Sequence, residues 1–577
     1  MDRFISIARG EERAQLVLKN ANIINVFTNE IIQGDVAIEE GYIVAIGDYE
    51  GIKEIDLEGK YLAPGFIDGH VHIESSKVTP GQFARAIVPR GVTTIIADPH
   101  EIANVKGLEG ILYMLEESRG LPLDVHIMLP SCVPATPFEN AGAVLDAKEL
   151  EKIIDKEGIL GLGEMMDYVG VINRDEKVLE KIKMARDKGR IIDGHGPMIK
   201  GKELNAFVAA GVKTEHECST VEEMAERLRL GMYIHIREGS AARNLRELIK
   251  LVNKDNLRRV LFCTDDKEPS DLLTEGSIDY NIRLAIREGI DPVDAVKIAS
   301  LNAAEAYGLK DKGAIAPLYR ADLVVIDNLE DFNILKVFKD GRLVAEDYKP
   351  LFEIPLSQNS SMKNTVNIKE VKEEDLEIII EGEEVNVIKL IPDSLITEKV
   401  VRKAGVDIEV EDGKFIGGKD ILKAAVVERH RATGNIGLGL VEGFGLKDGA
   451  IASTIAHDSH NIIVIGDNNR DMIVAIEELV KIGGGIALAS RGEIIGSLPL
   501  EIAGLMSERE LSEVQQNLDQ ILELAYDVLK VNKDIEPFMT LSFIALPVIP
   551  KLKLTDMGLF DVEEFKFLQI NRRKTIA

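Results

Sequence analysis

The chain has 577 residues, and its 69 basic and 98 acidic side chains give a formal net charge of −29. Hydrophobic residues make up 45% and charged residues 29%, which is typical of a globular protein and excludes a disordered, collagen-like or low-complexity chain. A chain with this excess of negative charge repels phosphate backbones and anionic lipids. We therefore expect neither nucleic acid nor a membrane as a partner. Small neutral or cationic ligands and divalent metals remain open.

The number of cysteines and the lengths of the apolar segments indicate in which cellular compartment we expect the protein. Three cysteines are too few for a disulfide framework, which indicates a reducing compartment. The first residues show no apolar core with a cleavage site, and no run of about 18 apolar residues occurs, so the sequence predicts neither a signal peptide nor a spanning helix. We therefore expect a cytoplasmic protein.

Two strand-rich stretches flank a long middle region. Residues 1–62 and 312–349 both contain short apolar or alternating segments between Gly, Asn and Asp turns. This arrangement predicts one small β domain, with a first part and a second part on either side of an insertion. Two unrelated β appendages are the alternative.

The middle region, residues 63–311, alternates short apolar segments with amphipathic helical ones. Eight such units in about 250 residues are the size and pattern of an α/β fold, the TIM (β/α)8 barrel. A doubly wound open sheet is the alternative. The eight predicted strands lie at residues 61–72, 93–100, 124–129, 159–166, 190–196, 212–217, 232–238 and 260–266.

The rest of the chain, residues 350–577, begins with a polar connection and reads as a C-terminal mixed α/β domain. Apolar positions at helical spacing predict helices over 472–483 and 507–530. Shorter apolar runs predict strands at 376–380, 385–391, 460–466 and 484–490.

Five of the eight predicted barrel strands end in a side chain that can bind a metal ion. Barrel enzymes build their active sites at these carboxyl ends, and two imidazoles at i and i+2 share one face of an extended strand. Four of the ten histidines of the chain occupy such ends. Four histidines and two carboxylates suffice for two divalent ions with a bridging carboxylate. These residues are His70, His72, Glu164, His195, His216 and Asp265.

Other polar residues follow neighbouring strands. Asp98 and His100 either support the metal site or act in proton transfer, or they form a turn with a solvent-facing imidazole. Arg237 and Glu238 either hold substrate or make a structural ion pair. Cys132 has no adjacent base in the pattern, so we expect it to line the pocket.

The stretch APGFIDGHVHIESS, residues 63–76, resembles the opening signature of the amidohydrolase superfamily, and the two flanking β stretches resemble its composite β domain. Most members carry a carboxylated lysine on the fourth strand, where this chain has Glu164. With that departure, several ordered motifs resemble the adenine deaminase family in particular. They are DPHEIAN, PSCVPATPFE, DGHGP, TEHE and IHIREGSAARNL in the middle region, and ERHRATGNIGLG and IASTIAHDSHNIIVIG near the C-terminus.

The resemblance implies a hydrolase that converts adenine and water to hypoxanthine and ammonia, in purine salvage. It implies two divalent ions, manganese or iron, and such ligands would also accept zinc. The resemblance implies that His70, His72 and Asp265 bind the first ion and that His195 and His216 bind the second. It also implies that Glu164 bridges the two ions. Asp265 is the implied base, whereas Glu164 and His100 both remain candidates for protonating the purine ring.

Several alternatives stay open. His457 and His460, in the HDSHN run, either help to hold the purine or belong to a loop that caps its own backbone. The enzyme could instead open a cyclic amide, as dihydroorotases, allantoinases and D-aminoacylases do, although those generally use the carboxylated lysine. A scaffold relative would lack metal ligands, whereas all six positions are filled here. We expect adenine as the small-molecule partner and a homo-oligomer, with a dimer as the family-level expectation.

Overall fold

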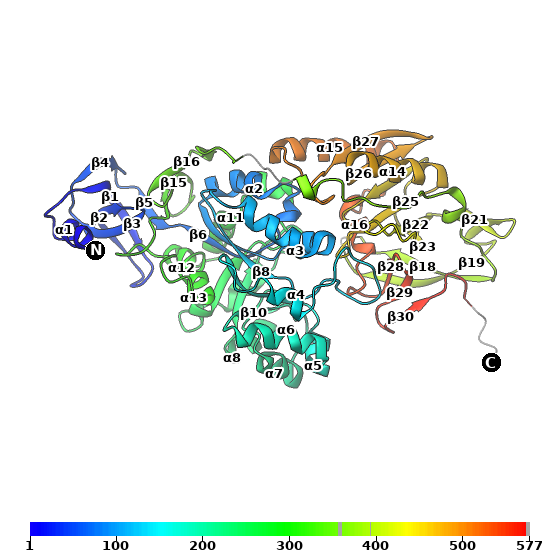
Figure 1. Cartoon of the computed structure of the whole chain (residues 1–577), viewed down its shortest axis with the longest axis horizontal. Helices are drawn as coiled ribbons and strands as arrows, with labels where there is room; N and C mark the ends of the chain where they lie inside the picture. The colour runs from blue at the N-terminus through cyan, green and yellow to red at the C-terminus, as the bar shows by residue number, and fades with distance from the viewer. Residues whose placement is uncertain (356–359, 393, 573–577) are drawn as a thin grey trace.

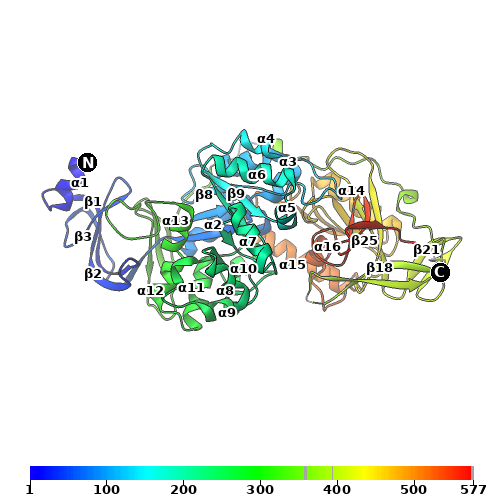
Figure 2. The ribbon, with the colours of Figure 1, turned by 90° about the horizontal axis from the view of Figure 1, so that it is seen from below.

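The computed structural model describes residues 1–355, 360–392 and 394–572, and its architecture is mixed α/β. Three bodies follow one another along the long axis (Figure 1). The central body lies between a β body at one end and an α/β body at the other, and the second view shows the same order (Figure 2). None of the described helices has the length and apolar character needed to cross a bilayer.

The β body is one sheet made from both flanks of the middle region. Strand β5 (Tyr61–Pro64) pairs in parallel with β1 (Ala14–Asn25) and antiparallel with β14 (Leu323–Ile326). Strands from both flanks thus hydrogen-bond in one sheet. The other strands are β2 (Glu30–Glu39), β3 (Tyr42–Gly47), β4 (Gly51–Asp56), β15 (Ile334–Lys339), β16 (Arg342–Glu346) and β17 (Lys349–Pro350), and α1 (Asp2–Ala8) packs beside β3.

Each of the eight segments predicted for the middle contains a parallel strand. One sheet has the order β10-β9-β8-β7-β6 and another β11-β12-β13. β10 contacts β11, and β13 contacts β6, so every strand has a neighbour on both sides. The strands are β6 (Phe66–Val71), β7 (Val92–Ala97), β8 (Asp124–Leu129), β9 (Ile159–Met165), β10 (Ile191–Gly194), β11 (Thr214–Glu215), β12 (Tyr233–Arg237) and β13 (Val260–Cys263).

The first predicted strand is divided between two bodies. Its residues 61–64 belong to the β body, and β6 begins two residues later. At Gly65 the backbone N–H donates to the carbonyl of Asp322, and an added Cβ would lie 2.2 Å from the Thr93 hydroxyl. A side chain at this position would collide with Thr93, so the chain passes from one sheet to the other at a glycine.

Helix α11 shows how a helix of the central body buries one apolar face. In α11, Ile278, Ile282 and Ala285 recur at helical spacing and are fully buried. Helix α8 begins at a capping box of Thr220 and Glu223. The helices are α2 (Pro80–Ile87), α3 (His100–Glu117), α4 (Ala147–Glu151), α5 (Tyr168–Asn173), α6 (Glu176–Asp187), α7 (Gly201–Ala210), α8 (Val221–Arg229), α9 (Leu245–Leu248), α10 (Pro269–Thr274), α11 (Ile278–Arg287), α12 (Pro292–Ile298) and α13 (Leu301–Tyr307).

The third body contains an eight-stranded sheet, ordered β19-β18-β23-β22-β25-β24-β26-β27. In β25, Ile462 and Val464 face α14, whereas Ile463 and Ile465 join the core shared with the central body. Its strands and helices are β18 (Glu384–Leu390), β19 (Thr397–Lys403), β20 (Ile408–Glu411), β21 (Lys414–Gly418), β22 (Ile421–Val427), β23 (Ile436–Glu442), β24 (Ala450–Ser453), β25 (Ile462–Gly466), β26 (Gly485–Ser490), β27 (Glu493–Pro499), β28 (Leu552–Thr555), β29 (Gly558–Asp561), β30 (Lys566–Leu568), α14 (Asn469–Ile482), α15 (Leu511–Asp527) and α16 (Pro537–Ile544).

The strand predicted at residues 376–380 is wrong. A 3-10 turn, Glu373–Leu376, occupies its start, and only Ile379 makes an isolated bridge to Lys414. Ile378 and Ile380 are nevertheless buried in a core cluster with the strands around them. The apolar run thus reflects burial without a continuous strand partner, a case that periodicity alone does not distinguish.

The carboxyl ends of the central strands face the third body. The turn after β6 is bonded to it, because Ser507 donates to the Lys77 carbonyl and its own carbonyl accepts from Thr79, at 2.9 and 3.1 Å. In the loop after β8, Asn140 donates to the buried Asp556 carboxylate through its backbone and its side chain, at 2.9 and 2.6 Å. Any site at these strand ends therefore borders both bodies.

Candidate active site

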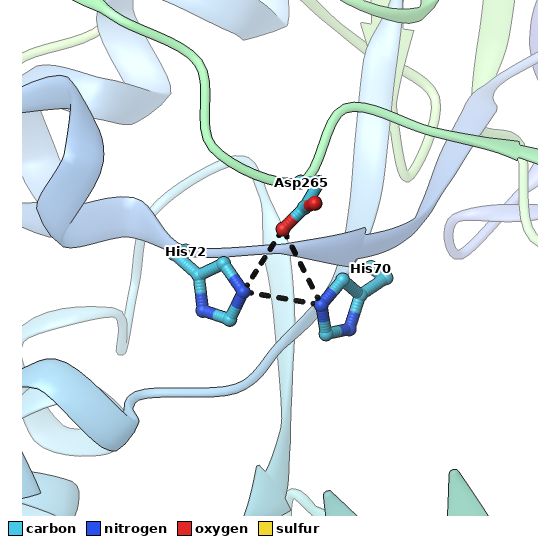
Figure 3. Close-up of side chains that lie close together, drawn as sticks. All are labelled: His70, His72 and Asp265. Carbon is cyan, nitrogen blue, oxygen red and sulfur yellow. Dashed lines mark hydrogen bonds and ion pairs between the residues drawn. The ribbon is translucent and has the colours of Figure 1, made fainter. Parts of the chain in front are cut away.

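Three of the predicted ligands form one triangle at the end of β6. Asp265 Oδ1 lies 3.1 Å from His72 Nε2 and 3.7 Å from His70 Nε2, and the two ring nitrogens are 3.1 Å apart (Figure 3). The backbone helps to set this geometry, since the Asp265 N–H donates to the His70 carbonyl at 2.9 Å. All three residues are buried.

Glu164, at the end of β9, lies between two histidine pairs. Its Oε1 is 3.4 Å from His72 and 4.0 Å from His70, whereas its Oε2 is 2.6 Å from His195 Nδ1 and 3.2 Å from His216 Nε2. Each carboxylate oxygen thus faces one pair. The six residues predicted to converge do converge, from strands as far apart as β6 and β13.

The ring protons fit a cation site. His72 Nδ1 lies 2.8 Å from the Asp98 carbonyl, which can only accept, so Nδ1 carries a proton and Nε2 is the nitrogen that faces the carboxylates. A histidine that ligates a metal commonly uses its other nitrogen in this way. His70 Nε2 lies 3.1 Å from His72 Nε2 and 3.7 Å from Asp265 Oδ1, and such a close set of nitrogen and oxygen donors suits divalent cations.

Asp98 and Arg237 support the ligands rather than stand apart from them. The Asp98 carboxylate, fully buried, accepts the backbone N–H of Glu164 at 2.9 Å. Arg237 donates to Asp265 Oδ2 at 2.7 Å and pairs with Glu217. Burial would raise the pKa of Asp265, but the charge of Arg237 and the bond with His72 outweigh it and hold that pKa well below its ordinary value.

The structure places two other predicted residues, Glu238 and Cys132, away from the predicted metal ligands and the cavity. Glu238 Oε2 accepts the backbone N–H of Leu245 at 3.2 Å and Oε1 lies 3.9 Å from Arg243, so the carboxylate faces α9 rather than the histidines. Cys132 is buried beside Ser131 and is not among the residues that line the cavity described below. Burial raises the pKa of its thiol, which leaves it protonated and unreactive.

His457 and His460 of the third body reach the central body. A cavity of about 360 Å³ lies between the two bodies, and both histidines line it together with Glu101, Asp266 and other residues. The Glu101 carboxylate is 3.0 Å from His457 Nδ1 and contacts His460 Nε2. This loop therefore does not merely cap its own backbone.

Two residues of this region were missed by the sequence reasoning. Glu217 lies 3.6 Å from His216 and 3.8 Å from His195. Glu101 directly follows His100 at the start of α3. Both belong to quoted motifs, TEHE and DPHEIAN, so the available signal was a second charged residue beside each histidine.

The contact of His457 with Glu101 predicts a pH-dependent stability. Burial alone would lower the pKa of His457, but Glu101 outweighs it and raises that pKa to about 9. In the unfolded chain the pKa of histidine is about 6.5, so below that pH the ion pair contributes its full stabilisation to the folded state. This stabilisation is lost as the pH rises through the folded-state pKa of about 9. The melting temperature of the wild type should exceed that of His457→Gln most below pH 6.5, and the gap should shrink towards pH 10.

Circular dichroism melts between pH 6 and 10 measure this gap. His430→Gln is the matched control: burial and nearby Arg429 hold the pKa of His430 well below 6.5, so its gap should rise slightly from pH 6 through the unfolded value of about 6.5, stay constant above that, and never shrink as the pH rises. A constant gap for His457→Gln would contradict the assignment of the ion pair.

The histidines and carboxylates at the strand ends lie within residues 61–344, which match a profile of the amidohydrolase family, so the protein is of the class of amidohydrolase-type hydrolases. A profile of the adenine deaminase C-terminal domain matches residues 394–566. Three relatives called adenine deaminase align over nearly the whole chain. That from Clostridium acetobutylicum is 53% identical over 98% of this chain and 99% of its own; that from Nitratidesulfovibrio vulgaris (strain DP4) is 50% identical over 99% of each; that from Geobacillus kaustophilus is 50% identical over 98% of each.

The chain therefore belongs to the adenine deaminase family. Its motifs in the central and third bodies, including the glutamate at the fourth strand, agree with that membership.

Proposed function

We propose that the protein hydrolyses adenine to hypoxanthine and ammonia, as a cytoplasmic enzyme of purine salvage. The observation that carries this proposal is the position of Glu164, whose two oxygens face separate histidine pairs. The family membership supplies the substrate, since relatives about half identical over the full length are called adenine deaminases. The free, buried cysteines agree with a reducing compartment.

The finer architecture belongs to the same proposal. We assign residues 63–311 to a TIM (β/α)8 barrel, residues 1–62 and 312–349 to the composite β domain and residues 350–577 to the C-terminal domain. Eight parallel strands with neighbours on both sides support the barrel. A homo-oligomer, with a dimer as the simplest case, remains our expectation from barrel enzymes of this kind.

Two divalent ions fit the ligands. The first would be held by His70, His72 and Asp265, the second by His195 and His216, with the fourth-strand glutamate shared between them. Manganese or iron is our expectation from the family, and the nitrogen and oxygen donors would also accept zinc. Such ions supply a nucleophile at neutral pH by lowering the pKa of water from 15.7 towards about 7.

The chain's own groups carry the protons. Replacing the amino group of adenine by oxygen consumes one water and releases one ammonia, so a proton must move from the attacking water to the departing nitrogen. Asp265, held ionised by Arg237, is positioned to accept that proton and pass it on. The purine ring nitrogen also needs a proton. We assign this step to His100 rather than Glu164, because the Glu164 oxygens already face histidines, among them His100 Nδ1 at 3.3 Å. The carboxylates of Glu101 and Glu164 outweigh burial and hold the pKa of His100 well above its ordinary value, so that the ring has a proton to give.

The substrate site in this proposal is the cavity between the barrel and the C-terminal domain, whose volume accommodates a bicyclic base. His457 and His460 form part of its wall with Asp266, the neighbour in sequence of the ligand Asp265, whereas none of the six ligands lines it. Arg237 and Asp98 act on those ligands, through Asp265 and the backbone of Glu164. We do not assign Glu238 to the substrate site, because its carboxylate accepts a hydrogen bond from the first residue of α9.

Ammonia release from adenine tests the proposal directly. Protein loaded with manganese, and separately with iron, should release ammonia from adenine and form hypoxanthine, whereas adenosine and cytosine should react far more slowly. Dihydroorotate and allantoin serve as controls for opening of a cyclic amide. Activity on these amides without activity on adenine would refute the proposal, and so would protein that binds no metal and stays inert after manganese is added.

A further inference from the structure

Glu101 joins the two bodies at a point that the proposed chemistry does not use. It lies at the start of α3 and is only 3% exposed. Its Oε1 is 3.4 Å from His100 Nε2 and 3.0 Å from His457 Nδ1, and its Oε2 contacts His460 Nε2. One buried carboxylate thus connects an imidazole of the barrel mouth with two imidazoles of the C-terminal domain.

A third metal ion at this cluster would be the simplest interpretation, but the ring protons argue against it. The backbone N–H of Ala456 donates to His460 Nδ1 at 3.2 Å, so Nδ1 carries the lone pair and the ring proton is on Nε2, the atom that faces Glu101. This is the opposite of His72, whose Nδ1 donates to a carbonyl. A protonated nitrogen cannot ligate a metal, so Glu101 accepts hydrogen bonds here.

The C-terminal side of this connection is held firmly. Arg429, fully buried, donates to the carbonyl of His460 and, at 3.0 Å, to that of Ala503. The backbone N–H of His460 donates to the Ala456 carbonyl at 2.7 Å. Because these bonds fix the loop, the imidazole of His460 fixes the Glu101 carboxylate in turn.

On the barrel side, the connection ends at His100. With Nε2 facing Glu101, the other nitrogen of the ring, Nδ1, points to the metal ligands and lies 3.3 Å from Glu164 Oε1. The ring also packs edge-on against His72, with centroids 4.6 Å apart. Turning the ring would therefore move Nδ1 away from the place where the purine ring must receive its proton.

We propose that Glu101 is a positioning residue that holds the His100 ring through its contacts with His457 and His460, so that the C-terminal domain completes the active site. The inference rests on the proposed function. It adds a residue beyond the ligands and the base, and it gives the distant C-terminal loop a role in turnover rather than in stability alone. The arrangement parallels other catalytic histidines, whose second nitrogen is oriented by a carboxylate.

The test compares Glu101→Gln, His460→Gln and the double variant with the wild type. Glu101→Gln should lower kcat for adenine about 10- to 100-fold, the usual cost of losing an orienting partner, while KM changes less than about threefold. The double variant should be no slower than Glu101→Gln alone, because both changes break one connection. Asp556→Asn is the matched control: it removes an equally buried carboxylate between the same two bodies and should leave kcat within about twofold.

Two further readouts do not depend on turnover. Metal content should match the wild type in every variant, because the ligands are untouched. Amide hydrogen exchange over residues 456–460 should quicken more in Glu101→Gln than in Asp556→Asn, because the Asp556 carboxylate reaches only Asn461, at the end of that loop. Should Glu101→Gln fail to fold, His460→Gln tests the same connection from the other side.

The outcomes separate this inference from the proposed function. A wild type that does not deaminate adenine overturns the proposed function, and this inference with it. An active wild type with Glu101→Gln as fast as Asp556→Asn overturns the inference alone, and so does a double variant whose losses multiply.

Discussion

Asp265→Asn is expected to lower kcat for adenine about 100- to 10,000-fold, the range for removal of a proton-transferring group. The amide cannot accept the proton of the attacking water, and Arg237 loses the anion that it contacts at 2.7 Å. Steady-state ammonia release from manganese-loaded protein measures the loss, with metal content determined on the same sample.

The control for this variant is Asp124→Asn. Asp124 begins β8, at the other end of a barrel strand, where it pairs with Lys312 and Lys339. Its loss should affect stability and leave turnover of the folded protein near the wild type. Near wild-type turnover of metal-replete Asp265→Asn protein would remove this residue from the mechanism.

Glu164→Gln is expected to affect both metal binding and turnover, because its two oxygens face both histidine pairs. Metal content should fall below two ions per chain, and kcat should drop at least about 100-fold, since the amide nitrogen would turn a donor towards a bare imidazole or a cation. Elemental analysis after gel filtration and the ammonia assay measure the two effects.

Glu39→Gln controls for the loss of a buried carboxylate. Glu39 is as buried as Glu164 but lies in β2 of the β domain, where it pairs with Arg3. It should retain both ions and full turnover. If Glu164→Gln kept two ions and wild-type rates, the bridging role would be untenable.

Most of the local structure, meaning the strands and the residues at their ends, could be predicted from the sequence. Strand ends were predictable because apolar runs stop at charged residues, and the converging histidines followed from the rule that parallel strands present their carboxyl ends on one face. The division of residues 61–72 at Gly65 was not predictable, because a run that passes from one sheet to another keeps its apolar character.

The contacts between bodies were beyond sequence reasoning. Glu101 and His460 are separated by 359 residues, and no periodicity relates the start of α3 to a loop before β25. Glu238 shows the converse limit: a charged residue at a strand end faces a backbone N–H of α9, because side chains alternate along a strand and only one face meets the mouth. Spacing predicts the face of a strand but not the partner from a distant segment.

The pairing of β5 with β14 has a consequence for how the chain is made. During synthesis the first five strands leave the ribosome about 260 residues before the strand that pairs with β5, so the hydrogen-bonding edge of β5 stays open while the whole barrel is translated. Contacts so distant in sequence form late and slowly. Nascent chains that stop before residue 323 should therefore be the species most prone to associate through that edge and most dependent on chaperones.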